Sequence, residues 1–285
     1  DENGDYLYLG DFTKLAEDGE YEIYQPDVGN SYSFEINNSV YNNVSNSLYR
    51  LIRTYHYETA GKLSYVLGNI MLTKEIYPNS EDNYFYIKKQ MALLLEQQNK
   101  KTGAVNLYIN NNVLTGDTAT GDTSTDDISN PEINTRETVS LTSSAEFAGV
   151  MAQYYNNYKD YDKAFANQCL QSATKAYNYM EKYRDNTSTD SWYYAATQLY
   201  RVTGSYKYKA AIKEYDDFSM EKRTVSEYDF TLLGDLTYLS TSYHTNLSRC
   251  QNLMNQYLQE AQEISYHSSK EHFYVQENID IMSED

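Results

Sequence analysis

One carboxylate, Glu58, lies in the stretch YETAGK at residues 57–62, beside a glycine and a lysine and directly before the apolar run LSYVLGNIML. An acidic side chain at such a turn could act as a general base that takes a proton from water. Glutamate and threonine before an apolar run are also ordinary residues of a helix N-terminus, where the helix dipole favours negative charge. The stretch by itself fits a catalytic site, a site that has lost its chemistry, or a simple helix start.

Motifs typical of nucleotide-binding and metal-dependent enzymes are absent from the sequence. It has no GxGxxG or Walker A loop for nucleotides, and no HExxH or CxxC pair for metals. The four histidines are scattered, and none of them forms a pair with metal-ligand spacing (His56, His244, His267 and His272). The motifs therefore predict no metal site and no cofactor.

A polar loop at residues 110–135 offers the one alternative to that prediction, because it is rich in Gly, Asp and Thr. Carboxylates are the hard oxygen ligands that Ca²⁺ prefers. The carboxylates of this loop belong to Asp117, Asp122, Asp126 and Asp127. Their spacing matches no calcium-binding loop, so we interpret the segment as a solvated loop and keep Ca²⁺ binding as the alternative.

The elements that must position these residues change in character along the chain. Residues 6–36 contain three short runs, YLYLGDF, YEIYQP and SYSFEI, separated by turns with Asp-Gly and Val-Gly-Asn. Such runs predict β-strands joined by hairpins. Because about three strands cannot close a sandwich, we expect this segment to pack against the rest of the protein or to end a larger β module.

From Ser39 onward apolar residues recur at spacings of three, four and seven, which predicts amphipathic helices. A stripe of Phe147, Val150, Met151 and Tyr154 is expected to face an inner ring of helices. Short turns between the periodic segments predict about nine helices of alternating direction, at residues 40–52, 63–71, 84–95, 147–158, 165–180, 192–202, 208–212, 230–239 and 247–264.

The composition limits the partners of the protein. Forty-one acidic and 23 basic residues give a net charge of -18, which argues against a nucleic-acid partner because phosphates would be repelled. No stretch approaches the ~20 apolar residues of a membrane span. The 33 tyrosines could stack on sugar rings, although filling helix interfaces is the simpler interpretation.

Several stretches, read in order, resemble glycoside hydrolase family 9, the cellulase family. YLGDFTKLAEDGEYEIYQPDVGNSYSFEI is similar to the end of the family's N-terminal immunoglobulin-like module, which passes directly into the first catalytic helix. TSSAEFAGVMAQYY, YDKAFANQCLQSATKAY, WYYAATQLYRVTGSYKY and FTLLGDLTYL are similar to successive helices of the catalytic domain. The collinear set carries the resemblance, since no single motif decides it.

The resemblance implies an (α/α)6 toroid with a substrate cleft at one end. We therefore expect residues 1–38 to be the end of an immunoglobulin-like module, and residues 39–285 to form an (α/α)6-type domain that is not complete. Enzymes of the family hydrolyse β-1,4-glucan with inversion: an Asp activates water and a Glu protonates the leaving oxygen. By the same resemblance, we expect an extracellular or cell-surface protein whose partner is β-glucan or another polysaccharide.

The sequence departs from the family at the catalytic residues. Thr59-Ala60-Gly61-Lys62 has Thr and Lys where the family's DAGD-type turn has Asp, so Glu58 is the remaining local candidate for a base. We expect the region of the family's catalytic Glu to lie outside the sequence, beyond Asp285.

Three interpretations stay open: a divergent member that no longer hydrolyses, a part of a longer protein, and an active enzyme of which segments are missing here. The alternative function is a non-catalytic scaffold or surface interaction protein, with protein partners at the cell surface, that kept the fold and lost the active site.

Overall fold

The structure is a computed structural model of residues 1–285, and it describes residues 10–12, 14–78, 83–109, 138–184, 189–218 and 228–268. The polar loop of residues 110–135, with its alternative of Ca²⁺ binding, His272 and the first residues of YLYLGDF lie outside these ranges. The chain divides into two compact units between His56 and Tyr57. The predicted domain boundary after Asn38, and the packing of the β segment on the helices, stay predictions.

The N-terminal unit contains two small antiparallel pairs of strands and one helix. Strands β1 and β4 pair with each other, as do β2 and β3, which form a hairpin around Val28 (β1 Gly19–Tyr21, β2 Tyr24–Gln25, β3 Gly29–Asn30, β4 Phe34–Ile36). Phe34 packs against Phe12 and Tyr21, with ring centroids 5.4 and 6.2 Å apart. Helix α1 follows over Asn42–Thr54.

The strands differ in detail from the sequence prediction. The run YEIYQP, expected as one strand, is divided between β1 and β2, because each of its ends pairs with a different partner. The GDF part of YLYLGDF, residues 10–12, forms no strand.

The second unit is built of helices, which lie where the apolar periodicity predicts them. With α1 they make nine helices in the described residues. Their bounds are α2 Ala60–Ile76, α3 Tyr84–Glu96, α4 Leu141–Tyr158, α5 Lys163–Tyr183, α6 Thr189–Thr203, α7 Tyr206–Phe218, α8 Phe230–Ser240 and α9 Leu247–Ser268.

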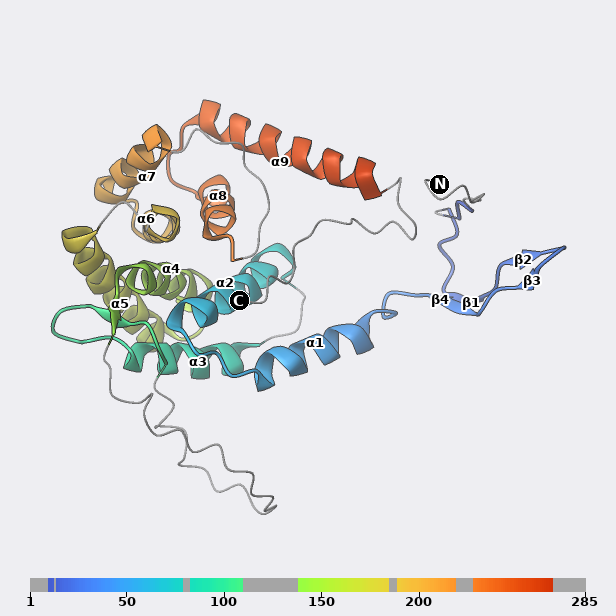
Figure 1. The fold of residues 1–285 in the computed structure, drawn as a ribbon, viewed down its shortest axis with the longest axis horizontal. Helices are drawn as coiled ribbons and strands as arrows, with labels where there is room; N and C mark the ends of the chain where they lie inside the picture. Colours follow the sequence, from blue (N-terminus) through green and yellow to red (C-terminus); the bar gives the residue numbers. More distant parts are fainter. Residues whose placement is uncertain are drawn as a thin grey trace, which may run out of the picture. The chain divides into compact units, whose positions relative to one another are not determined.

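These eight helices form two layers (Figure 1). Helices α2, α4, α6 and α8 contact one another in succession, and α2 also contacts α8, so that the four make an inner group. Each of them also carries one outer helix: α3 packs on α2, α5 on α4, α7 on α6 and α9 on α8. Alternation of inner and outer helices along the chain is the architecture of an (α/α) barrel, as the sequence predicted.

Inner helices α4 and α6 are buried on nearly every side because neighbours surround them. Phe147, Val150, Met151 and Tyr154 of the predicted stripe are all fully buried. Gly149 on α4 allows the close approach of α6, since a Cβ atom there would lie 2.2 Å from the Tyr194 ring. A helix enclosed in this way has no solvent face that polar residues could occupy freely.

A short strand pair that the sequence analysis missed ties two inner helices together at their N-terminal ends. Strand β5 (Val105–Asn106) pairs antiparallel with β6 (Val139–Ser140), which leads directly into α4. The residue after β5, Leu107, accepts a hydrogen bond from the Ala60 N–H at the start of α2 (2.8 Å). Two-residue strands have no period to detect, so only the paired structure reveals them.

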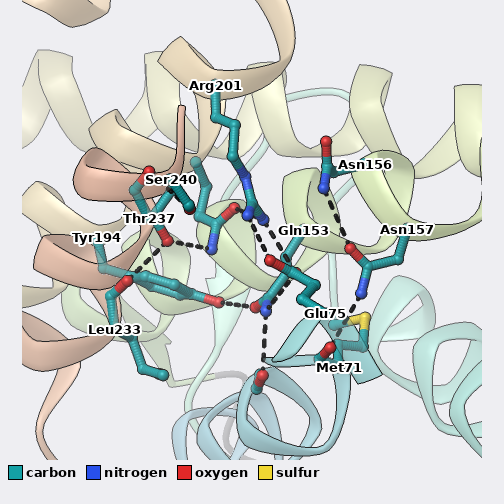
Figure 2. A network of polar contacts seen from close by, with 12 residues as sticks. Met71, Glu75, Gln153, Asn156, Asn157, Tyr194, Arg201, Leu233, Thr237 and Ser240 are labelled. Carbon is teal, nitrogen blue, oxygen red and sulfur yellow. Dashed lines mark hydrogen bonds and ion pairs between the residues drawn. The ribbon is translucent and has the colours of Figure 1, made fainter. Parts of the chain in front are cut away.

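A polar network lies near the C-terminal ends of the four inner helices (Figure 2). Arg201 of α6 forms an ion pair with Glu75 of α2, with Nη1 and Oε2 2.5 Å apart. Gln153 of α4 donates to Glu75 Oε1 (3.2 Å) and accepts from the Tyr194 hydroxyl (2.8 Å). The network fixes α2, α4 and α6 against one another.

Candidate active site

A cavity of about 480 Å³ lies at the opposite, N-terminal ends of the four inner helices. Its lining comes from residues at or next to the first turns of α2, α4, α6 and α8, together with Leu107 after β5. Since the C-terminal ends of these helices share the network around Glu75, the four helices run in the same direction. Their N-terminal dipoles therefore converge on this cavity.

The YETAGK stretch lies at this end of the inner helices. Thr59 caps α2 by accepting a hydrogen bond from the Lys62 N–H (3.3 Å), and Thr59, Gly61 and Lys62 all line the cavity. The stretch is thus a helix start, and Glu58 directly precedes its cap. Its side chain is exposed and does not line the cavity, while its carbonyl accepts from the Ile109 N–H (2.9 Å).

A carboxylate that the sequence analysis did not single out, Glu146 of α4, also lines the cavity. Its side chain is 8% exposed, and the Ser191 hydroxyl donates a hydrogen bond to Oε1 (3.1 Å). Burial raises the pKa of Glu146 to about 7, and the hydrogen bond from Ser191 offsets part of that rise. In the described part of the chain, Glu146 forms no ion pair with a Lys or Arg.

Glu146 lies directly against the turn that resembles the family's base motif. A Cβ atom on Gly61 would be 2.3 Å from Glu146 Oε2, so a larger residue at this point of α2 would displace the carboxylate. The sequence contained a signal for this residue. It is the one acidic residue in TSSAEFAGVMAQYY, where nearly every neighbour is small or apolar.

Two further carboxylates line the cavity, and each has a structural partner. Asp190, in the first turn of α6, accepts from the Tyr215 hydroxyl (3.0 Å). Asp229 caps α8 by accepting from the Leu232 N–H (2.8 Å). The cavity thus combines three carboxylates with the single ammonium group of Lys62 among the residues that line it.

Aromatic side chains complete the lining. Phe230 is buried and contacts Tyr194, while Tyr228 is 44% exposed and packs on Tyr65. Tyr228 has a positive φ of 52°, the one such non-glycine residue in the described part of the chain. An aromatic face beside hydrogen-bonding groups is the combination with which proteins bind sugar rings.

The sequence predictions about metals and membranes concern residues that do not line this cavity or that lie outside the described ranges. Within the described ranges, no group of three or more His, Cys, Asp or Glu side chains could hold a metal ion. The described helices also include none with the length and apolar character that a transmembrane segment needs.

The helical layers and the YETAGK turn agree with the family that the sequence resembles. Comparison with models of known families decides whether the chain belongs to it. Residues 103–283 match the model of glycosyl hydrolase family 9. The chain belongs to this family.

Solved structures of family 9 proteins share the fold of the chain at low sequence identity. A metagenome-derived family 9 endoglucanase is 16% identical, with a TM-score of 0.71 over 93% of this chain and 62% of that one. A family 9 protein of Bacteroides ovatus is 18% identical, with a TM-score of 0.57 over 76% and 46% of the two chains. AaCel9A in complex with cellobiose-like isofagomine is 16% identical, with a TM-score of 0.58 over 76% and 46%.

The chain spans 62% of the length of the first of these structures and 46% of the other two. A comparison with curated proteins finds no match.

Proposed function

We propose that this family 9 protein takes a β-1,4-glucan into the cavity at the N-terminal ends of α2, α4, α6 and α8, and hydrolyses it with inversion. The observation that carries the proposal is the lining of that cavity, which joins three carboxylates to the aromatic rings of Tyr228 and Phe230 within a family 9 fold. A related structure that holds a cellobiose-like ligand supports the choice of glucan.

Glu58 is part of this proposal as the candidate base. Its exposed side chain precedes Thr59, which lines the cavity. Release of reducing ends from soluble cellulose derivatives, compared between the wild type and Glu58→Gln, tests this role. A strong loss in the variant supports it, and equal rates would reject Glu58 as the base.

Binding is tested separately from hydrolysis. Affinity electrophoresis in β-glucan gels should show retardation of the wild type and weaker retardation of Tyr228→Ala, because that change removes an aromatic face from the cavity. Tyr183→Ala is the matched control, since Tyr183 is also about half exposed but lies on α5, outside the cavity. An unretarded wild type would contradict glucan binding.

A second candidate function is favoured by the turn itself. Thr59-Ala60-Gly61-Lys62 lacks the carboxylates of the family's motif, and threonine and lysine cannot take a proton from water near neutral pH. A non-catalytic scaffold or surface interaction protein would keep the helical layers without this chemistry. Retardation without reducing-end release supports a glucan-binding module. The absence of both retardation and reducing-end release supports a scaffold.

The proposed site of action is outside the cell or at its surface, because an insoluble or polymeric glucan is accessible there. Secretion of the natural protein, measured by its recovery from culture medium, tests this placement.

A further inference from the structure

A second cavity, of about 520 Å³, lies between α7 and the connection from α8 to α9. Its lining comes from the first two turns of α7, from Tyr238 near the C-terminal end of α8, and from residues 244–248, which lead into α9. The candidate active site uses Phe230 at the other end of α8, about 12 Å away along the helix. The two cavities share no lining residue, so they are separate sites.

The charge of this second cavity is opposite to the charge of the protein. Lys209 and Lys213 line it together with His244, and no Asp or Glu of the described residues does so, whereas the whole chain has a net charge of -18. The two lysines are four residues apart on α7, so they share one face of the helix. Among the described residues, neither lysine forms an ion pair. Like charges at this spacing destabilise a helix, and an anion bound between them would offset that repulsion.

Apolar side chains form much of the remaining wall. Ile212 and Tyr238 contribute buried surface, whereas Tyr206 and Leu247, which are 81% and 80% exposed, lie at the rim. A cavity of this size, with apolar walls and a few charged groups, is the usual form of a small-molecule site. Its ligand should therefore carry a flat apolar body as well as a charge.

The wall opposite α7 is fixed by hydrogen bonds to the inner helices. The Tyr200 hydroxyl of α6 donates to the His244 carbonyl (2.8 Å), and the Tyr238 hydroxyl accepts from the Asn246 N–H (2.9 Å). The side-chain oxygen of Asn246 also accepts from the Arg249 N–H in the first turn of α9 (3.1 Å). A wall held in this way loses little freedom on binding, which favours affinity for a small ligand.

We propose that this cavity binds a small organic anion in which one carboxylate is attached to a flat aromatic body. The carboxylate accepts hydrogen bonds from the ammonium groups of Lys209 and Lys213. The ring packs against Ile212, Tyr238 and Leu247.

Other ligand classes fit this cavity less well. A polyanion would be repelled by the net charge of the protein. A neutral glucan needs acceptors for its hydroxyl groups, and the carboxylates that could accept from them line the candidate active site but not this cavity. The proposal does not depend on the function proposed for the active-site cavity.

Three probes separate the contribution of the charge from that of the ring. Equilibrium dialysis should give a dissociation constant below about 1 mM for naphthalene-2-carboxylate. Naphthalene-2-carboxamide, which keeps the ring without the charge, should bind about tenfold more weakly. Acetate, which keeps the charge without the ring, should also bind at least about tenfold more weakly. Equal binding of the carboxylate and the carboxamide, or a carboxylate that does not bind at about 1 mM, would overturn the proposal.

Variants place the binding at this cavity. The double variant Lys209→Gln, Lys213→Gln should weaken naphthalene-2-carboxylate by about tenfold and leave the carboxamide unchanged, because only the charge of the site is removed. Leu247→Ser, at an exposed position, should weaken both naphthalene probes by about threefold. Lys100→Gln, Lys101→Gln removes the same charge from an exposed turn outside the cavity, so this matched control should bind both probes as the wild type does.

The remaining outcomes decide between a site and a general effect of charge. An equal loss of carboxylate binding in both double lysine variants would show a long-range charge effect and overturn the site. Displacement of naphthalene-2-carboxylate by cellotetraose would assign the cavity to a neutral sugar and overturn it as well. Retardation in β-glucan gels should be the same in Lys209→Gln, Lys213→Gln as in the wild type, so a failure of this proposal and a failure of the proposed function are seen separately.

Discussion

The two ends of the inner helices surround a carboxylate with different partners. At the C-terminal ends, Glu75 is paired with Arg201, and amide side chains complete the hydrogen bonds (Figure 2). At the N-terminal ends, Glu146 accepts a hydrogen bond from the Ser191 hydroxyl and forms no ion pair with a Lys or Arg of the described residues, and burial raises its pKa to about 7. A carboxylate neutralised by a cation stabilises the packing of helices, whereas one left without a cation keeps a proton that it can transfer.

Breaking the ion pair should give the largest effect on stability. Arg201→Met leaves Glu75 without its cation in a largely buried place, which costs about 3–5 kcal/mol of unfolding free energy. Urea unfolding followed by circular dichroism measures the loss. In the double variant Glu75→Leu, Arg201→Met most of that loss should be recovered, because no unpaired charge remains. A loss below about 1 kcal/mol in the single variant would contradict the comparison.

Removing the charge of Glu146, at the N-terminal ends of the inner helices, should raise the free energy of unfolding, whereas Arg201→Met lowers it. Glu146 has a pKa of about 7 in the folded protein against 4.5 as its ordinary value, so the folded state binds the proton more tightly than the unfolded state. The resulting stability is complete below about pH 4.5 and is lost as pH rises through about 7. Glu146→Gln does not titrate, so it should be more stable than the wild type at pH 8, by up to about 3 kcal/mol.

The measurement is the difference in unfolding free energy between the two proteins at pH 5 and at pH 8. A constant difference across this range would show that Glu146 titrates normally. Glu96→Gln, on an exposed surface, should show no such pH dependence.

The close approach of α2 to Glu146 can be tested with a smaller change. Gly61→Ala places a methyl group where Glu146 Oε2 lies, so the carboxyl group must move. We expect a loss of about 1–2 kcal/mol, the usual cost of an added methyl group in a packed site. The loss should shrink when Glu146→Ala is also present, and an additive double variant would contradict direct contact.

The smallest expected effect concerns the hydrogen bond from Ser191. Ser191→Ala removes a donor that favours the ionised carboxylate, so the pKa of Glu146 should rise further. Stability should change by about 1 kcal/mol or less. Carbon-13 NMR titration of the glutamate carboxyl groups follows this pKa directly, and a lowered pKa in the variant would contradict the role of Ser191.

The sequence predicted well wherever one element carries its own signal. Apolar spacing predicted the helices, including the buried stripe of Phe147 on α4, and the collinear resemblance predicted family 9 and its helical barrel. Prediction from the sequence was less successful where the pairing of strands determines the structure. The run YEIYQP divides between two strand pairs, and β5 and β6 are too short to have a detectable period.

The candidate site shows the same division between local and tertiary information. The YETAGK turn could be located from sequence because a cap and an apolar run define a helix start. Glu146 could not be assigned, because 85 residues separate it from Gly61 in the sequence, and its environment depends on helices that meet only in the folded protein. Periodicity determines which face of a helix is apolar. Only tertiary packing determines which buried carboxylate receives a cation and which is left to titrate, since desolvation and ion pairing depend on neighbours distant in the chain.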